Sequence, residues 1–277
     1  MVEHFLGKEE VTGSIPVNGS IYFIRMGISS LLAHPLMRGL DIDDPRTTDL
    51  RRKVIASNGF LRAIYDEWYA LLVERVPAGA GHVLEIGSAA GILAGRVPQL
   101  IRSEILQLPG LDAVLDAHVL PFADQSLKAI VMVDVLHHLP QPRQFFAEAQ
   151  RCLMPGGVVV MIEPWVSWWS RLIYGHLHHE PFQPAAADWT FPAGGPLSGA
   201  NGALPWIIFE RDRHSFDREF PGLSVAEIRT MMPFRYLVSG GVSMRQLMPA
   251  WTFSVWRALD RLFSAWPMFA LVHLRKT

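Results

Sequence analysis

The chain contains 277 residues, of which 50% are hydrophobic and 18% are charged, with a net charge of −1 at pH 7. That length accommodates one large α/β domain or two small ones, with ample apolar material for a core. The near-zero charge argues against a nucleic-acid binder, because such proteins normally present a basic face to phosphates. The single cysteine, Cys152, excludes an internal disulfide and fits a reducing cytoplasm, and its apolar surroundings predict a buried structural thiol.

The mean hydropathy of +0.19 is high for a soluble enzyme and raises the question of a membrane. A spanning helix is not predicted, because no stretch of ~18 uninterrupted apolar residues exists. The N-terminus lacks the basic-then-apolar order of a signal peptide. We therefore expect a cytoplasmic protein and leave peripheral membrane contact open.

Residues 1–25 differ in composition from the rest, since glycine, serine, proline and asparagine interrupt any helical or strand period. The run Gly13-Ser14-Ile15-Pro16 can be encoded by a sequence that resembles the T-arm of a transfer-RNA gene. Two interpretations stay open: a disordered N-terminal segment, or translation that begins at Met26.

Between residues 50 and 76, apolar residues recur at helical spacing and stop at a Pro-Ala-Gly sequence, which predicts a helix. A buried strand is predicted at 82–86. It runs into a glycine-spaced turn, 87–91, where bare backbone lets a ligand approach closely. The following segment, 92–101, is predicted to form a helix that is broken or shortened near Pro98.

Strands and helices alternate along the rest of the chain. Residues suited to strands form five further runs, at 111–115, 129–135, 158–162, 224–236 and 269–275. Helical patterns are found at 143–153 and, rich in aromatic residues, at 251–266. This alternation predicts an α/β fold with a doubly wound, Rossmann-like parallel sheet.

Three carboxylates lie at what we expect to be successive strand ends of the sheet. Glu104 follows Gly87 at close to the ~20-residue offset at which a strand-2 carboxylate binds a ribose diol. Asp116 and Asp134 end the next two strands, and Asp116 is suited to accept a hydrogen bond from an adenine amino group. An acidic pocket with no basic residue in the glycine turn favours a cationic ligand without a pyrophosphate, and S-adenosylmethionine is such a ligand.

The run from Val83 to Pro164 resembles the class I S-adenosylmethionine-dependent methyltransferases, particularly the type 11 group. The matching motifs are LEIGSAAG at 84–91, LDAVLDAHVLPFADQSLKAIVMVDVLHHL at 111–139 and RCLMPGGVVVMIEP at 151–164. The resemblance implies a seven-stranded, mostly parallel sheet with an antiparallel last strand, and S-adenosylmethionine as cofactor. It implies cofactor contacts from Glu85, Gly87, Ser88, Ala89 and Gly91 in the glycine loop, Glu104 at the ribose, Asp116 and Ala117 at the adenine, and Asp134, Val135 and His138 after strand 4.

Two departures from the family pattern bear on cofactor binding. Ala89 stands where the family has its central glycine, which stiffens the turn. Glu104 and Asp116 are too close in sequence for a full helix between strands 2 and 3, so we expect the Pro109-Gly110 turn to replace it and to leave the adenine side more open. A cofactor-binding but inactive scaffold or partner subunit is therefore one alternative.

We expect a single methyltransferase domain over residues 26–277. The flanks of the core pack over the carboxyl edge of the sheet and carry substrate choice. The segment at about 180–215 is rich in Pro, Gly, Ala and Trp and fits either a lid or a packed loop. The expected parts are a core at 80–164, an N-terminal helical cap at 26–79, the insertion at about 180–215, and C-terminal strands with the aromatic helix at 216–277.

Methyl transfer from a sulfonium is an in-line displacement that depends largely on positioning, and a general base is needed only for a weakly acidic acceptor. His137 and His138 follow strand 4 and are the candidate catalytic residues, with a structural role at a helix entry as the alternative. Glu163 and Trp165, at the end of strand 5, are candidate acceptor contacts.

The run His-x-His-His-Glu at 176–180 contains residue types that bind transition metals. No cysteine or second acidic cluster accompanies it, so we predict no metal and take His178 and His179 as candidate substrate contacts.

The aromatic residues from Trp251 to Phe269, with Arg257 and Arg261 among them, fit an interfacial helix or ordinary core packing. Together with the apolar flanks they favour a hydrophobic small molecule, a lipid or a lipid-linked glycan as acceptor. A nicotinamide-dependent oxidoreductase is a further alternative, which requires a helix N-terminus facing a pyrophosphate. The sequence leaves the oligomeric state open.

Overall fold

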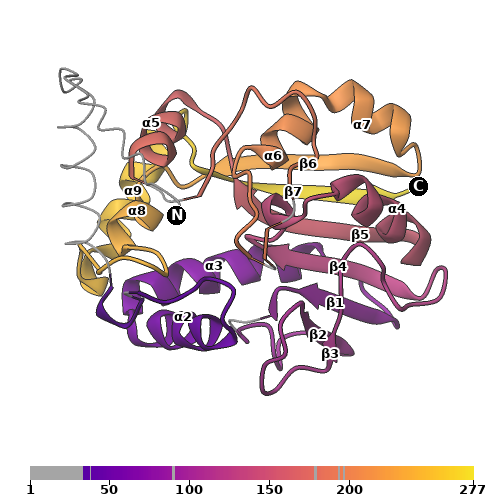
Figure 1. The fold of residues 1–277 in the computed structure, drawn as a ribbon, viewed down its shortest axis with the longest axis horizontal. Helices are drawn as coiled ribbons and strands as arrows, with labels where there is room; N and C mark the ends of the chain where they lie inside the picture. The colour runs from indigo at the N-terminus through magenta and orange to yellow at the C-terminus, as the bar shows by residue number, and fades with distance from the viewer. Residues whose placement is uncertain (1–33, 38, 89–90, 178–179, 193, 196) are drawn as a thin grey trace, which may run out of the picture. The chain divides into compact units, whose positions relative to one another are not determined.

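Seven strands form one sheet in the order β3-β2-β1-β4-β5-β7-β6 (Figure 1). Neighbouring strands from β3 to β5 pair in parallel, whereas β7 pairs antiparallel with both β5 and β6. The expected seven-stranded, mostly parallel α/β sheet is thereby confirmed. The strands are β1 (His82–Ile86), β2 (Leu100–Glu104), β3 (Ala113–Val114), β4 (Leu127–Val133), β5 (Leu153–Pro164), β6 (Leu223–Met231) and β7 (Phe269–Lys276).

The structure is a computed structural model that describes residues 34–277, apart from positions 38, 89–90, 178–179, 193 and 196. The expectations for residues 1–25 and for Met26 therefore lie outside the described residues. The helices are η1 (Pro35–Met37), α2 (Pro45–Ser57), α3 (Gly59–Arg75), η3 (Leu136–His138), α4 (Pro142–Cys152), α5 (Trp168–Leu177), α6 (Leu204–Trp206), η4 (Ile207–Arg211), α7 (Arg213–Glu219), α8 (Arg235–Ser239), η5 (Ala250–Thr252) and α9 (Phe253–Leu262).

The single helix predicted at 50–76 is two helices, α2 and α3, divided at Asn58. The side-chain oxygen of Asn58 accepts a hydrogen bond from the Leu61 N–H and so caps the start of α3. Its amide donates to the carbonyl of Ser239, 2.9 Å away. Asparagine is a preferred N-cap residue, and here the cap also ties α3 to the end of α8.

The prediction of a helix at 92–101 is wrong for the described residues. Residues 91–99 form turns, and β2 begins at Leu100. Gly95 and Gln99 adopt positive φ angles of 76° and 55°, which right-handed helices do not contain. A helix N-terminus facing the glycine turn is therefore absent from the described part of this segment.

The link between β2 and β3 contains no helix over residues 105–112, as predicted from its length. The carboxylate of Asp112 accepts hydrogen bonds from the backbone N–H and the guanidinium of Arg102, each at 2.9 Å. Gly110 turns the chain with a φ of 82°. This turn brings the residues after β3 back to the carboxyl edge of the sheet.

Several predicted limits differ from the structure. The late strand expected at 224–236 ends at Met231, because Pro233 has no N–H to donate and α8 begins at Arg235. The aromatic helix expected at 251–266 is shorter and consists of η5 followed by α9. The strand expected at 111–115 is reduced to two residues of β3.

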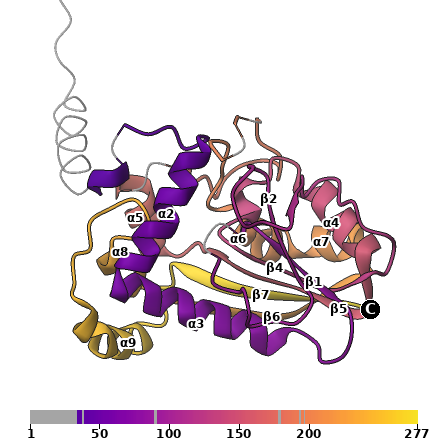
Figure 2. The same ribbon diagram turned by 90° about the horizontal axis from the view of Figure 1, so that it is seen from below.

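Side chains that alternate along the central strands supply two hydrophobic cores. On one face, Leu84 of β1 and Ile130 of β4 belong to a core shared with α4, α6, η4 and α7. On the other face, Val83 and Val131 pack in a core built mainly with α3, which Figure 2 shows lying across the sheet. Because both faces are covered, the central strands are apolar on both sides.

The segment 180–215 contributes to the first of these cores. Its buried side chains include Trp189, Ala203, Leu204, Ile207 and Ile208. The indole N–H of Trp189 donates to the carboxylate of Asp212 at 2.9 Å, which ties the segment to the start of α7. The segment is thus packed, and a lid role for part of it stays a prediction.

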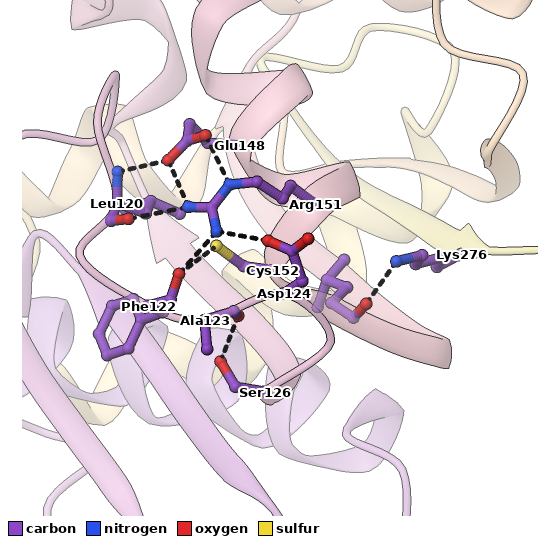
Figure 3. Close-up of polar contacts among 10 residues, drawn as sticks. Leu120, Phe122, Ala123, Asp124, Ser126, Glu148, Arg151, Cys152 and Lys276 are labelled. Atoms are coloured by element: carbon purple, nitrogen blue, oxygen red, sulfur yellow. Dashed lines mark hydrogen bonds and ion pairs between the residues drawn. The ribbon is translucent and has the colours of Figure 1, made fainter.

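Arg151 of α4 holds the loop between β3 and β4 (Figure 3). Its guanidinium donates to the carbonyls of Leu120 and Phe122 at 3.0 and 2.7 Å and pairs with the carboxylate of Glu148. The next residue, Cys152, is fully buried, with its sulfur 3.7 Å from the Phe122 carbonyl. The predicted buried thiol is confirmed, and the loop that it helps to fix forms one wall of the site described below.

Three short helices lie at the end of the sheet where β5 stops and β7 begins (Figure 1). These are α5, α8 and α9, and the same end is the carboxyl edge of the parallel strands. No helix in the described part of the chain is both long and apolar enough to cross a bilayer.

Candidate active site

A cavity of about 670 Å³ lies along the carboxyl edge of the parallel strands. One part of its wall comes from residues that follow β1, β2, β3 and β4. Another part comes from α3, α5, α8 and the residues around Glu180. In open α/β sheets, ligands bind in the crevice outside the carboxyl ends of the strands, so this cavity is the candidate active site.

Gly87 begins the turn after β1 and lines the cavity. Its φ is 77°, and a Cβ there would lie 2.5 Å from the Cγ2 of Val135 in the loop after β4. Only glycine permits this approach of the two loops. Gly91 also has a positive φ, 65°, but has open space around it. Ala89, which falls between them, lies outside the described residues.

Glu85 and Ser88 are buried beside this turn rather than in the cavity wall. Within the described part of the chain neither carboxyl oxygen of Glu85 makes a hydrogen bond of regular geometry. Burial raises the pKa of this carboxyl, and the neighbouring hydroxyls of Ser88 and Tyr69 act in the opposite direction. Direct cofactor contact from Glu85, Ser88 or Gly91 stays a prediction.

Glu104, Asp116 and Ala117 line the cavity. Glu104 ends β2 and is only 6% exposed, and its Oε1 accepts a hydrogen bond from the Ile105 N–H. Asp116 follows β3, where its Oδ1 accepts from the N–H of His118 at 2.9 Å. The structure thus places these two carboxylates along one crevice, as their positions at strand ends imply.

Asp134 and Val135 follow β4 and also line the cavity. Asp134 has a φ of 55°, which is uncommon for a residue other than glycine. Its N–H donates to the carbonyl of Ile162 at 2.9 Å, so the strained backbone is held against β5. Burial raises the pKa of the Asp134 carboxyl to about 7, although nearby His137 works to lower it.

His137 is held by carboxylates on both sides of its ring. Its Nδ1 lies 2.7 Å from Oε2 of Glu163, and its Nε2 lies 3.5 Å from Oε2 of Glu180. Burial opposes the charged imidazolium, but the two carboxylates outweigh burial and raise the pKa of His137 to about 10. The two carboxylates therefore favour the charged imidazolium of His137 near neutral pH.

The pKa of His138 is shifted in the opposite direction. Its Nδ1 lies 3.1 Å from the carbonyl of Gly199, and its Nε2 lies 3.9 Å from Oε1 of Glu180. Burial and the charge of His137, whose ring centroid is 4.2 Å away, lower the pKa of His138 to about 4. Both histidines line the cavity, and the neutral one of the pair is His138.

Glu163 and Trp165 do not line the cavity, so the structure gives no support to direct acceptor contact from either. Glu163 is fully buried, and its Oε1 accepts hydrogen bonds from the N–H groups of Val135 and Leu136. It therefore reaches the site through His137. Trp165 packs in the core, while Pro164 lines the cavity. His178 and His179 lie outside the described residues.

The part of the cavity wall that comes from α3, α5 and α8 contains residues that sequence reasoning missed. Tyr65, Tyr174 and Tyr236 line it. Burial raises the pKa of each phenol, so these hydroxyls stay protonated. The sequence offered one signal for them: a tyrosine on an otherwise apolar helix face has a polar hydroxyl that needs a partner or a cavity. Gly240 and Gly241, both with positive φ, form part of the same wall and mark a turn that the sequence also shows.

A family model described as a methyltransferase domain matches residues 85–161, which span from β1 into β5. The match confirms the expected S-adenosylmethionine-dependent methyltransferase domain over these residues. Among solved structures, the chain is similar to geranyl diphosphate C-methyltransferase from Streptomyces coelicolor A3(2), with a TM-score of 0.50 and 13% identity over 82% of this chain and 83% of that one. At that identity the likeness concerns the fold.

Two mycobacterial proteins that resemble part of this chain have nearly the same name. Phthiotriol/phenolphthiotriol dimycocerosates methyltransferase of Mycobacterium tuberculosis is 48% identical over 52 residues, which are 18% of this chain and 19% of that protein. Phthiotriol/phenolphthiotriol dimycocerosates methyltransferase 1 of Mycobacterium ulcerans is 44% identical over 54 residues, which are 19% and 20% of the two chains. The chain therefore matches about a fifth of the length of these relatives.

Proposed function

We propose that the protein transfers the methyl group of S-adenosylmethionine to a hydrophobic small molecule, a lipid or a lipid-linked glycan. One observation carries this proposal: a single cavity joins the acidic strand ends to a largely apolar, aromatic chamber. Phe182, Met268 and Phe269 line that chamber together with the three tyrosines. Mostly apolar walls with a few polar groups are typical of sites for small apolar ligands.

The cofactor half of the proposal rests on the carboxylates. In it, Glu104 binds the ribose, Asp116 and Ala117 contact the adenine, and Gly87 and Asp134 lie beside the methionine moiety. Carboxylates along the crevice complement the net positive charge of the cofactor. When bound, the cofactor supplies an electrophilic methyl group. The alternative nicotinamide cofactor has less support, because residues 91–99 provide no helix N-terminus for a pyrophosphate.

We propose His137 and His138 as the catalytic residues on the acceptor side. Their rings are fixed by Glu163 and by the Gly199 carbonyl, so they can hold an acceptor group in one place. Fixing the nucleophile close to the methyl carbon supplies much of the rate enhancement in such a displacement. The phenol groups of the chamber act as hydrogen-bond donors rather than bases, because their pKa values are raised.

The lipid-type acceptor has separate support from the surface and from the relatives. Trp251 of η5 and Leu262 of α9 are 82% and 74% exposed, and Arg257 and Arg261 are exposed on α9. Exposed apolar residues beside cations suit an interface with anionic lipid. We propose that this face makes peripheral membrane contact. The names of the two mycobacterial relatives also specify complex lipids as their substrates.

Methyl-labelled S-adenosylmethionine, incubated with the protein and with fractionated cell extracts, tests the function. We expect label to enter an organic-solvent-extractable product, and not nucleic acid or protein. Cofactor binding with no transfer to any fraction would instead support the inactive scaffold. Binding of NADH in place of S-adenosylmethionine would overturn the cofactor assignment.

Co-sedimentation with anionic lipid vesicles tests the proposed membrane contact. We expect the wild-type protein to co-sediment and the Trp251→Ser/Leu262→Ser variant to lose this binding.

A further inference from the structure

We infer that His137, His138 and Glu180 bind one divalent transition-metal ion in the wall of the cavity. One ligand atom from each of the three residues lies within 4.8 Å of the other two. All three residues line the cavity, so an ion held by them would face it. Metal binding at this place requires no particular acceptor and would hold even for a protein without methyltransferase activity.

The second contacts of the two histidines fix which nitrogen of each ring faces Glu180. Nδ1 of His137 lies 2.7 Å from a carboxylate oxygen of Glu163, and Nδ1 of His138 lies 3.1 Å from the Gly199 carbonyl. Each Nδ1 therefore donates its hydrogen to a fixed acceptor, so Nε2 is the atom available to a metal, and an ion that binds there releases the second proton of His137 to solvent. Metal-ligating histidines almost always donate their other N–H to a carboxylate or a backbone carbonyl.

The distances across the cluster suit a bridging ion better than direct hydrogen bonds. Nε2 of His137 is 3.5 Å from one oxygen of Glu180, and Nε2 of His138 is 3.9 Å from the other. Both separations exceed the usual N–H···O distance of roughly 2.7–3.2 Å. A tetrahedral zinc ion with bonds of about 2.0–2.1 Å has ligand atoms roughly 3.4 Å apart. Small side-chain movements would close the cluster around an ion.

A second grouping, Asp134 with His137 and Glu163, is geometrically possible but chemically weaker. Glu163 is fully buried, and its Oε1 already accepts two backbone N–H bonds. Its Oε2 accepts from Nδ1 of His137. Since both oxygens are engaged, Glu163 orients a ligand rather than serving as one.

The donor set indicates the kind of ion. Two imidazoles and one carboxylate suit zinc, iron or cobalt, whereas magnesium and calcium prefer oxygen ligands alone. Three protein ligands leave at least one coordination position open, as in catalytic sites. That position would face the cavity, where a bound hydroxyl or carboxylate of an acceptor could occupy it. A metal there would lower the pKa of a coordinated hydroxyl.

The test is metal titration of untagged, chelator-treated protein. We expect one equivalent of Zn²⁺ by calorimetry and by elemental analysis, and visible absorption typical of tetrahedral or five-coordinate Co²⁺. His138→Ala and Glu180→Gln should each weaken binding at least 100-fold. Glu163→Gln, which removes the charge of the orienting partner and no ligand, should weaken it roughly 10- to 100-fold. His176→Ala is the matched control, because His176 is exposed on α5 and bonds to the Leu172 carbonyl.

Circular dichroism and thermal melting of each variant establish that it folds. Glu180→Gln is the conservative variant, should His138→Ala fail to fold. The absence of a stoichiometric metal in the wild-type titration would overturn the site. The same conclusion would follow if folded His138→Ala and Glu180→Gln bound Zn²⁺ as tightly as wild type. In that case the cluster is a metal-free ion pair in which a protonated His137 lies between two carboxylates.

Discussion

Replacement of Glu104 by glutamine is the most direct test of the cofactor pocket. Glu104 ends β2, is 6% exposed and lines the cavity. Glutamine keeps the size of the side chain and an oxygen that can accept from the Ile105 N–H, as Glu104 does now. The fold should therefore survive, and the change removes one negative charge from the place where we expect the ribose diol.

The expected loss follows from the strength of a charge-assisted hydrogen bond. Such a bond contributes about 1.5–3 kcal/mol, and each 1.4 kcal/mol is a factor of ten in affinity. We therefore expect S-adenosylmethionine to bind Glu104→Gln roughly 10- to 150-fold more weakly in calorimetric titration. The control is Glu74→Gln, because Glu74 is exposed on α3 outside the cavity wall, and its affinity should match wild type.

S-adenosylhomocysteine separates two explanations of that loss, because it has the same ribose but no sulfonium. A ribose contact predicts an equal loss for both ligands. A purely Coulombic effect predicts a loss for the sulfonium ligand alone. Unchanged affinity of a folded Glu104→Gln for both ligands would refute the placement of the ribose.

Three further predictions concern packing. Arg235→Met should cost about 3–5 kcal/mol of unfolding free energy in urea, because it leaves the buried carboxylate of Asp260 without its guanidinium partner; the double variant with Asp260→Asn, which keeps an oxygen that accepts from the Phe234 N–H, should recover most of the loss. Gly87→Ala should destabilise more than Gly91→Ala, because both have positive φ but only the first introduces a Cβ clash; equal thermal melting of the two variants would contradict this. Cys152, buried and with a raised pKa, should react with a thiol reagent only after unfolding; rapid labelling of the native protein would show otherwise.

The position of the three carboxylates along the cavity could be predicted because it depends on local rules. Buried runs of β-branched residues identified the central strands, and parallel strands bring their carboxyl ends to one edge. Glu104, Asp116 and Asp134 each follow a strand, so their sequence positions alone place them along one crevice. The prediction of a helix after β1 was wrong, because the composition of residues 92–101 is compatible with a helix. The positive φ angles of Gly95 and Gln99, which rule a helix out, are visible only in the structure.

The wall that we propose for the acceptor depends on contacts between distant segments, which the sequence does not encode locally. Tyr65 lies on α3, Tyr174 on α5 and Tyr236 on α8, and only the packing of these helices brings them to one wall. Glu180 belongs to a run whose histidines suggested a separate cluster. In the structure, Glu180 instead lies beside His137 and His138, which belong to the loop after β4.

The cluster around His137 bears on whether the protein is a catalyst or an inactive scaffold. Burying His137 between Glu163 and Glu180 costs folding free energy, because three ionisable groups lose much of their hydration. Apolar residues would fill the same volume with less desolvation, so stability alone does not account for these side chains. Such costly groups gather where chemistry requires shifted pKa values or metal ligands. Since His137, His138 and Glu180 line the cavity that also contains the cofactor carboxylates, their arrangement favours an active enzyme.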